Sequence, residues 1–357
     1  MIHTSEWVSI GHPDKTADFI SSFLLDRYIE ADPDTRYAVE VQIKDQFVTL
    51  GGEVTSKAGF LPRDIEEFVR AAVARVGYTP EYRDYWGSAN TIGSDDVVVA
   101  LHLSQQSPDI AQGVDADRGW GDQGIFWGMA VNNPATDYMP PDWFKAQDIG
   151  RQLMCAPYRP FCGIDIKTQV TYDERIGQFR NIVIAAPVKT EEAEAELLRS
   201  LYAIIPGSAG FVLNGTGRYV RHGPLGDCGT TGRKLAVDFY GGNCFLGGGS
   251  PWTKDGTKAD LTLNLYARFR ALKKLYETGL PLVRCAISCR IGSPEIELAF
   301  FGENNNLIGA SREERSPRAL IDMFRLREPR YARMCMDGLF RWMPNPEAWD
   351  NCGIVSR

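Results

Sequence analysis

Apolar residues recur at every third or fourth position in several parts of the chain, which is the pattern of an amphipathic helix. Pro13 and Pro62 stand where two such segments begin, and proline is favoured in the first turn of a helix. Gly77 and Gly279 follow two of the segments, and glycine commonly ends a helix. We predict helices over residues 14–28, 62–76 and 261–276, and a fourth over residues 191–201, which are rich in strong helix formers.

Other segments alternate apolar with polar residues or form short apolar runs, as strands do. Lys44-Asp45-Gln46 lies between two of them and predicts a hairpin. The apolar run at residues 235–240 is also interpreted as a strand. The remaining predicted strands are residues 37–43, 47–50, 97–103, 169–172, 181–188, 283–291 and 296–300.

Helices and strands are mixed in each third of the chain, and the alternating strands keep one polar face. This favours layered α+β units over a doubly wound parallel sheet. A chain of 357 residues also exceeds the size at which one core usually keeps growing. Glycine and proline clusters place boundaries near residues 110 and 222, so we expect three units: 1–110, 111–221 and 222–357.

The composition is that of a globular protein, with 44% hydrophobic and 24% charged residues. The net charge is -7, from 46 acidic and 39 basic residues, so no overall basic field favours nucleic acid. The first residues are too polar for a signal peptide, and no apolar run is long enough to cross a bilayer. We therefore expect a cytoplasmic protein with neither a nucleic-acid nor a membrane partner.

The spacing of the cysteines argues against a structural zinc site. There are eight cysteines but no Cys-x-x-Cys pair, and the chain has only four histidines. In a long cytoplasmic chain the thiols are expected to be reduced and mostly buried.

Two common nucleotide motifs, the Walker A loop and the Gly-x-Gly-x-x-Gly turn, are absent. Three glycine-rich clusters with cations and carboxylates are present instead. The first, residues 11–15, places His12 and Asp14 at a predicted helix start, where backbone amides and the helix dipole favour a phosphate. Asp14 could share a magnesium ion with that phosphate. The alternative is that Asp14 only stabilises the helix start.

The second cluster, residues 226–234, ends in Arg233 and Lys234 and suits an oligophosphate, although a solvated loop would also carry such a pair. The third cluster, residues 247–260, places Lys254 and Lys258 before a helix and offers Asp260 to a metal. Charged turns before helices are common, so the third cluster alone is a weak signal.

Together these clusters resemble the S-adenosylmethionine synthetase family from Thr4 to about Gly292. The matching motifs occur in the family's order: Gly11-His12-Pro13-Asp14-Lys15, Gln106-Ser107-Pro108-Asp109-Ile110, Gly121-Asp122-Gln123-Gly124 and Gly226-Asp227-Cys228-Gly229 through Gly232-Arg233-Lys234. The resemblance implies three similar α+β domains in a pseudo-threefold arrangement, with sheets packed at a dimer interface. It implies a homodimer with sites between subunits, and pairing into a tetramer stays open.

The implied reaction joins the adenosyl group of ATP to the sulfur of L-methionine, and the released triphosphate is hydrolysed to pyrophosphate and phosphate. The implied catalytic residues around the triphosphate are His12, Lys167, Arg233, Lys234 and Lys254. Further ATP contacts are Asp165 at the ribose, Arg218, Tyr219 and Ile291 at adenine, and Asp227 and Ser250. The implied methionine contacts are Glu53, Gln106, Asp122, Asp227 and Lys258. Asp14 and Asp260 match ligands of two Mg2+ ions, and Glu40 matches a K+ ligand.

The loop from Ser104 to Gly124 is interpreted as a lid that excludes water. The chain departs from the family at Phe245-Leu246, where Arg-His is usual, and at residues 250–253, where Ser-Pro-Trp-Thr replaces a small residue followed by Phe-Ser-Gly. Two rival functions are a binding protein that holds ATP or S-adenosylmethionine and a transferase with another acceptor. Glu53 and Gln106 argue against the second rival.

Overall fold

The computed structural model describes residues 1–105, 119–207 and 209–340. In this part of the chain twelve strands form three four-stranded sheets, in the orders β1-β6-β7-β8, β12-β11-β10-β5 and β4-β3-β2-β9. The first contains β1 (Ile2–Val8), β6 (Lys167–Asp173), β7 (Gln178–Ala185) and β8 (Gly210–Leu213). The second contains β5 (Gly124–Val131), β10 (Leu282–Cys289), β11 (Glu295–Phe301) and β12 (Leu307–Glu314). The third contains β2 (Arg36–Lys44), β3 (Phe47–Thr55), β4 (Val98–Ser104) and β9 (Gly229–Thr230).

Strand pairing is mostly antiparallel, as predicted for an α+β protein. Among the strands of the described ranges, only β7 with β8 and β3 with β4 are parallel. Each sheet joins strands that are far apart in the sequence: β1 pairs with β6, β5 pairs with β10, and β9 pairs with β2. The arrangement of the sheets therefore does not test the predicted domain boundaries near residues 110 and 222. They stay a prediction.

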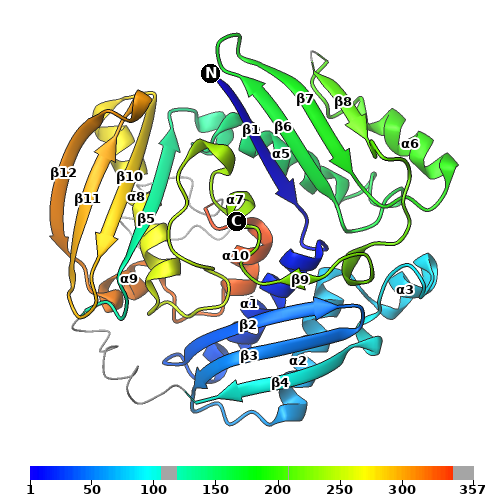
Figure 1. Cartoon of the computed structure of the whole chain (residues 1–357), viewed down its shortest axis with the longest axis horizontal. Helices are drawn as coiled ribbons and strands as arrows, with labels where there is room; N and C mark the ends of the chain where they lie inside the picture. The colour runs from blue at the N-terminus through cyan, green and yellow to red at the C-terminus, as the bar shows by residue number, and fades with distance from the viewer. Residues whose placement is uncertain (106–118, 208, 341–357) are drawn as a thin grey trace.

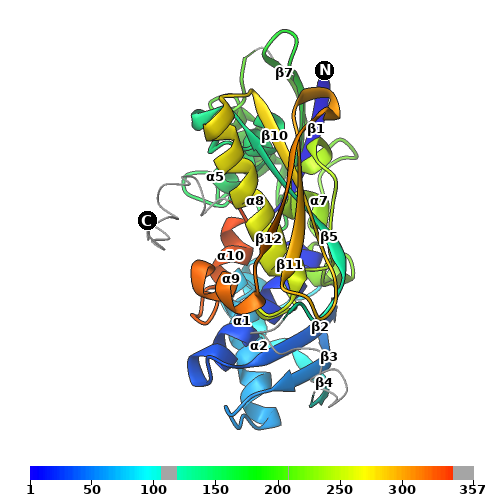
Figure 2. The ribbon, with the colours of Figure 1, turned by 90° about the vertical axis from the view of Figure 1, so that its left-hand side faces the viewer.

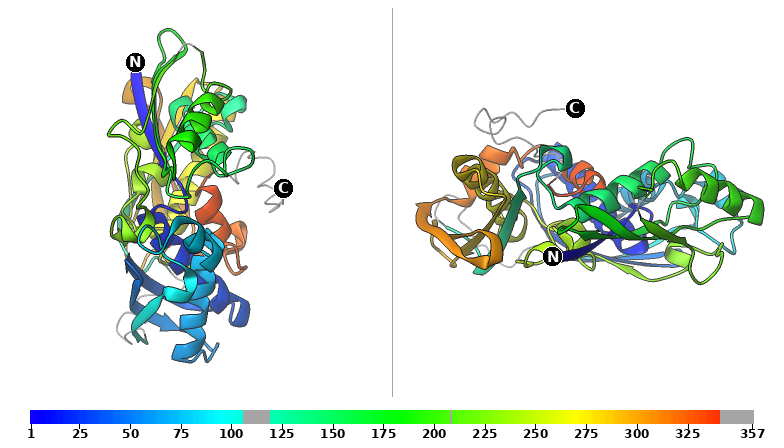
Figure 3. Two further views of the ribbon diagram at one scale, coloured as in Figure 1. Left: turned by 90° about the vertical axis from the view of Figure 1, so that its right-hand side faces the viewer. Right: turned by 90° about the horizontal axis from the view of Figure 1, so that it is seen from above.

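Figure 1 shows the three sheets as three lobes around a centre where β1, α1, α7 and α10 meet. Figures 2 and 3 show that the molecule is flat, with the sheets toward one face and most helices on the other. The helices are α1 (Pro13–Ala31), α2 (Pro62–Val76), α3 (Pro80–Trp86), α5 (Pro141–Leu153), α6 (Glu191–Leu201), α7 (Leu235–Asp238), α8 (Ala259–Thr278), α9 (Pro317–Phe324) and α10 (Tyr331–Asp337).

Helix α1 is buried on nearly all sides, because it packs against α2, α10, β2 and β9 at once. Its side chains belong to a large core shared by the second and third sheets, while a smaller core lies under β1, β6, β7 and α6. The N-terminus of α1 thus lies next to the segment before β6 in the first sheet and next to β9 in the third sheet.

The predicted helices and the hairpin are confirmed. Helix α2 ends at Gly77 with φ 118°, and α8 ends at Gly279 with φ 65°, both in the left-handed region that glycine tolerates. The turn at Asp45 joins β2 to β3 in register. No helix in the described ranges has the length and apolar character needed to span a membrane.

One prediction was wrong: residues 235–240 do not form a strand. Their first four residues form the short helix α7, in which the Asp238 amide donates to the Lys234 carbonyl at 3.0 Å. A short apolar run does not distinguish a buried strand from a buried helical turn. Of the predicted lid, residues 106–118 lie outside the described ranges.

Candidate active site

The turn between β1 and α1 holds His12 at the start of the helix. The His12 ring caps α1: its Nδ1 accepts a hydrogen bond from the Asp14 amide at 3.1 Å. Since Nδ1 is the acceptor, the proton of the neutral ring is on Nε2. A Cβ on Gly11 would lie 2.4 Å from the Ile164 carbonyl oxygen, so glycine allows this turn to approach the segment before β6. His12, and not Asp14, therefore provides the cap.

The His12 imidazole is kept uncharged by its surroundings. Burial, together with the nearby ammonium groups of Lys167 and Lys234, lowers its pKa from 6.5 to about 3. At neutral pH the ring is therefore a neutral donor through Nε2–H. This donor lies among cations that would also attract an anion.

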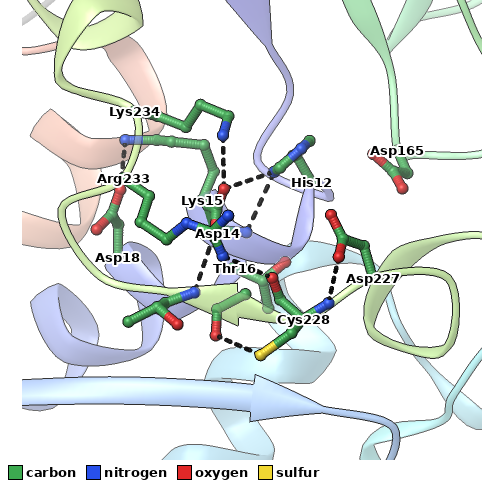
Figure 4. A network of polar contacts seen from close by, with 12 residues as sticks. His12, Asp14, Lys15, Thr16, Asp18, Asp165, Asp227, Cys228, Arg233 and Lys234 are labelled. Carbon is green, nitrogen blue, oxygen red and sulfur yellow. Dashed lines mark hydrogen bonds and ion pairs between the residues drawn. The ribbon is translucent and has the colours of Figure 1, made fainter.

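Asp14 is the centre of the first polar cluster. Its Oδ2 accepts a hydrogen bond from Lys234 Nζ at 2.6 Å, and its Oδ1 accepts one from the Thr230 amide at 2.9 Å. Arg233 approaches Oδ1 to 3.5 Å. Burial raises the pKa of Asp14, but the bonds from Lys234 and Thr230 outweigh it, so the pKa falls below its ordinary value. Figure 4 shows Arg233, Lys234 and His12 around this carboxylate.

The segment from Gly229 to Lys234 is fixed to α1 through its backbone. A Cβ on Gly229 would lie 2.1 Å from the Pro13 carbonyl oxygen, so only glycine allows so close an approach. The Gly232 amide donates to Asp18 Oδ1 at 2.9 Å. These contacts bring the first and second predicted clusters together, although they are more than 200 residues apart in the sequence.

Asp165 and Lys167 border the same cluster. Asp165 is buried, and its Oδ2 accepts a hydrogen bond from the Gly223 amide at 2.9 Å. Its Oδ1 is buried and has no hydrogen-bond partner in the described part of the chain. Burial raises the pKa of Asp165 to about 6. The charge of the exposed Lys167 lowers the pKa of His12 and opposes the rise in the pKa of Asp165.

The third predicted cluster lies beside β2. Lys254 donates to Asp260 Oδ2, and the Gly249 amide donates to Asp260 Oδ1 at 2.6 Å. Lys254 also forms a β-bridge with Ala38 in β2. Asp260 is in the first turn of α8, and Lys258 precedes that helix. A predicted metal ligand is thus paired with a lysine here, as Asp14 is paired with Lys234.

Glu40 connects the second and third clusters. Its Oε2 accepts a hydrogen bond from the Thr231 hydroxyl, and its Oε1 accepts one from the Thr253 hydroxyl at 3.1 Å. Thr231 lies two residues before Arg233, and Thr253 immediately precedes Lys254. The clusters that carry these cations therefore share one exposed carboxylate on β2.

The carboxylates fit magnesium, although they form no closed cage. No group of three His, Cys, Asp or Glu side chains able to hold a metal occurs within the described ranges. Magnesium is commonly held by one or two carboxylates together with substrate phosphates and water. Asp14 and Asp260 suit this arrangement. Glu40 with two hydroxyl groups is an all-oxygen set that suits a hard monovalent ion.

Other predicted residues are not joined to the first cluster by direct contacts. Arg218 donates to the Lys189 carbonyl at 3.0 Å, and Ile291 is exposed next to Trp120. The Tyr219 hydroxyl reaches the Asp165 carbonyl at 3.4 Å. Asp227 is exposed and accepts a hydrogen bond from the Cys228 amide at 2.8 Å.

The predicted methionine contacts are also separate. In the described ranges no hydrogen bond or ion pair joins Glu53, Asp122 and Lys258 to one another. Asp122 is exposed beside Cys289, whose Sγ donates to the Asp122 carbonyl at 3.4 Å. Gln106 lies outside the described residues. Ser250 is buried, and its Oγ accepts a hydrogen bond from the Trp252 amide.

Sequence reasoning missed a buried ionic network behind these residues, formed by Lys15, Asp18, Asp238 and Trp252. A lysine and an aspartate three positions apart in a helix are usually interpreted as a solvated pair. The available signal was their position inside a helix whose neighbours are apolar on several sides.

Comparison with known proteins supplies the deciding observation. An S-adenosylmethionine synthase from Zymomonas mobilis is 36% identical over 318 aligned positions, and the match covers 82% of this chain and 78% of that protein. This chain belongs to the S-adenosylmethionine synthetase family. The family's N-terminal domain model matches residues 1–108, and its C-terminal domain model matches residues 221–350.

The family resemblance extends to the whole fold. A solved structure titled as an unusual S-adenosylmethionine synthetase from Campylobacter jejuni covers 98% of both chains, with a TM-score of 0.84 and 28% identity. The residues interpreted from the sequence as departures from the family lie on the surface as well as in the core. Phe245 and Leu246 are exposed, and the Phe245 ring packs 4.8 Å from Trp127, whereas Trp252 is buried.

Proposed function

We propose that this chain is a methionine adenosyltransferase that makes S-adenosylmethionine from ATP and L-methionine. The methionine sulfur attacks C5' of ATP, the C5'–O bond breaks, and the tripolyphosphate leaves with the bonding electrons. One observation supports this most: Arg233 and Lys234 converge with His12 on the N-terminus of α1, from a remote part of the sequence. Family membership points to the same reaction.

His12 and the cations stabilise the leaving group. Negative charge increases on the tripolyphosphate as the C5'–O bond breaks, so fixed positive groups stabilise the transition state more than the ground state. The Nε2–H of His12 donates a hydrogen bond to the departing oxygen. A thioether has no proton to remove, so the transfer needs no general base, and a neutral His12 is consistent with this role.

Asp165 is proposed to bind the ribose. Its buried Oδ1 has no protein partner in the described ranges, and a ribose hydroxyl would satisfy this acceptor. Arg218, Tyr219, Ile291, Asp227 and Ser250 remain predicted contacts of ATP, and adenine binding at the first three requires Arg218 to leave the Lys189 carbonyl.

Members of this family use metal ions. We propose that Asp14 and Asp260 each hold one Mg2+ ion and that Glu40 holds K+ with Thr231 and Thr253. Bound magnesium would neutralise phosphate charge and orient water for tripolyphosphate hydrolysis. In this arrangement Lys234 and Lys254 are released from their aspartates and can contact phosphate oxygens.

Methionine is proposed to bind through Glu53, Gln106, Asp122, Asp227 and Lys258. Carboxylates suit both its ammonium group and the sulfonium charge that develops on sulfur. Because Glu53 and Asp122 are not in contact within one chain, a site shared between two subunits is the arrangement that the family suggests for them. We also propose that the protein is cytoplasmic.

A homodimer is supported by the second sheet. Its face without helices carries an open groove of about 640 Å³, lined mainly by apolar residues. The lining includes Ile125, Trp127, Leu298, Ala299 and Phe301. An exposed apolar surface of this kind commonly marks a protein interface, and we propose that a second copy covers it.

A product assay tests the function. The purified chain is incubated with ATP, Mg2+, K+ and L-methionine, and S-adenosylmethionine, pyrophosphate and phosphate are measured, with methionine omitted as the control. The expected result is methionine-dependent formation of all three products. ATP binding without any methionine-dependent product would instead favour a binding protein.

A further inference from the structure

Lys15 is a buried cation, so its side chain does not form part of the surface of the proposed active site. Its side chain lies inside the protein, with Nζ 2.6 Å from Asp238 Oδ1 and 3.1 Å from Asp18 Oδ2. The same ammonium lies 4.5 Å from the centre of the Trp252 ring. These three contacts occupy the ammonium group of Lys15 inside the protein.

Each partner of Lys15 also holds a segment that supplies active-site cations. Asp18 Oδ1 accepts the amide of Gly232, which immediately precedes Arg233 and Lys234. Asp238 Oδ2 accepts the indole N–H of Trp252 at 2.8 Å, two residues before Lys254. Lys15 itself is next to Asp14 in α1, as Figure 4 shows. One ammonium thus connects the three segments that form the proposed tripolyphosphate site.

The site needs such a connection because its own charges repel one another. Lys167, Arg233, Lys234 and Lys254 are all positive, and two of them share the Asp14 carboxylate. Contacts on the solvent side change when a polyanion or metal binds. The Lys15 contacts lie behind the site, so they hold the backbone of residues 229–238 against α1 in either case.

Trp252 connects the segment before Lys254 to this network. The indole is buried and contributes both its ring, beneath Lys15, and its N–H, to Asp238.

We propose that Lys15 is a positioning residue for polyphosphate binding, acting through Asp18 and Asp238 on the Arg233-Lys234 segment and through Asp238 and Trp252 on the Lys254 segment. The inference rests on the proposed function. It does not require Lys15 to contact substrate. Removing its charge should displace the cations while leaving the methionine contacts in place.

The test uses the full chain with inorganic tripolyphosphate and Mg2+ as the probe, measured by calorimetry. Lys15→Met should raise the Kd for tripolyphosphate about tenfold, because several charge-assisted contacts lose alignment together. It should lower kcat about a hundredfold, the cost of a small misplacement. The KM for methionine should stay within about threefold of the wild-type value. Wild-type tripolyphosphate binding in Lys15→Met would overturn the proposal.

Arg268→Met is the matched control, because Arg268 is also a fully buried cation, and its hydrogen bonds within the described ranges go to the carbonyls of Met129, Asp137 and Tyr138. Both variants should lower Tm, but only Lys15→Met should weaken tripolyphosphate binding. Equal weakening in both would mean that loss of stability explains the effect, and the proposal would fail.

Two further variants separate positioning from charge balance. The double variant Lys15→Met/Asp238→Asn removes one charge of each sign, so it should regain part of the lost Tm and still bind tripolyphosphate weakly. Recovery of wild-type binding would show that Lys15 only neutralises Asp238. If Lys15→Met does not fold, Trp252→Phe removes the N–H, keeps an aromatic ring of smaller size and should raise the Kd about threefold; wild-type binding there would overturn the proposal.

The two proposals fail in distinguishable ways. A wild-type chain that forms no S-adenosylmethionine would refute the proposed reaction. The Kd for tripolyphosphate of Lys15→Met and Arg268→Met would still test whether Lys15 is a positioning residue.

Discussion

At the scale of single residues, the unusual feature is a histidine that stays neutral among lysines. Burial, Lys167 and Lys234 all disfavour its charged form, and the Asp14 amide occupies its Nδ1. His12 can therefore donate from Nε2 across the physiological pH range. This differs from a histidine that exchanges a proton during catalysis, and the difference is measurable.

The first prediction concerns pH and His12. Its folded pKa of about 3 lies below the ordinary 6.5, so the unfolded chain binds a proton between these values and the folded chain does not. Stability is therefore lost as pH falls from about 6.5 toward 3. Between pH 7 and pH 5 the free energy of unfolding should fall by about 2 kcal/mol on account of His12.

Urea unfolding of wild type and His12→Asn at both pH values checks this, since asparagine keeps a helix cap but does not titrate. The variant should lose less stability on acidification. His222, whose pKa burial lowers to about 4, keeps part of the wild-type response. An identical pH dependence in the two proteins would contradict the assignment.

The second prediction concerns Lys167. Replacing it by methionine should lower kcat/KM for ATP about a hundredfold or more, because one fixed charge near the leaving group is lost. Tm should change little, since the side chain is exposed. Lys57→Met, at another exposed lysine, should leave both quantities unchanged. Normal turnover in Lys167→Met would remove this residue from the phosphate site.

The family resemblance predicted that His12, Asp14, Arg233 and Lys234 lie together, and the structure brings them together. The charge pattern of each motif alone left other interpretations open. The buried pair of Lys15 and Asp18 was not identifiable in this way. Its burial results from packing of α1 against α10, and only the three-dimensional arrangement shows that these charges are enclosed.

At the scale of elements, the contact between β9 and the start of α1 determines the site. Thr230 can reach Asp14 only because Gly229 lies against the Pro13 carbonyl. The predicted consequence is that Gly229→Ala separates the two elements. Tripolyphosphate affinity and turnover should each fall at least about tenfold, with helix content by circular dichroism preserved.

Gly309→Ala provides the control, because a Cβ at Gly309 in β12 meets no atom within 4 Å. It should behave as wild type. If Gly229→Ala also behaves as wild type, the close approach of β9 to α1 is not required for binding.

Helices and strands with local sequence signals were predictable, whereas the strands with which they pair were not. Pro62 and Gly77 specify the ends of α2 within the sequence itself. By contrast, β1 pairs with β6, more than 150 residues later, through a pattern that any alternating strand could offer. The segment at residues 235–240 became a helical turn because Asp238 is held inward by Lys15 and Trp252.

At the scale of the whole molecule, the flat arrangement places most helices on one side of the sheets and leaves the opposite side without helices, as Figure 2 shows. The prediction is that Ile125→Asp, at an exposed position on β5 lining the groove, reduces the mass in solution to that of a monomer and abolishes turnover. Burying an unpaired carboxylate in an apolar interface is strongly unfavourable.

Light scattering with the product assay checks this result. Leu198→Asp, at an exposed position on α6, is the control and should keep both mass and activity. A wild-type chain that is already monomeric and active would contradict the proposed dimer. An Ile125→Asp dimer with normal activity would place the interface elsewhere.

The pairing of Asp14 with Lys234 and of Asp260 with Lys254 has a consequence for the order of events. Each aspartate can neutralise either an ammonium group or a divalent cation, so the two compete for the same oxygens. Exchange of one for the other releases a lysine that a polyanion can then attract. Magnesium and tripolyphosphate should therefore each strengthen the binding of the other by the same factor, as thermodynamic reciprocity requires. Calorimetric titrations of each, with and without the other, would measure that factor.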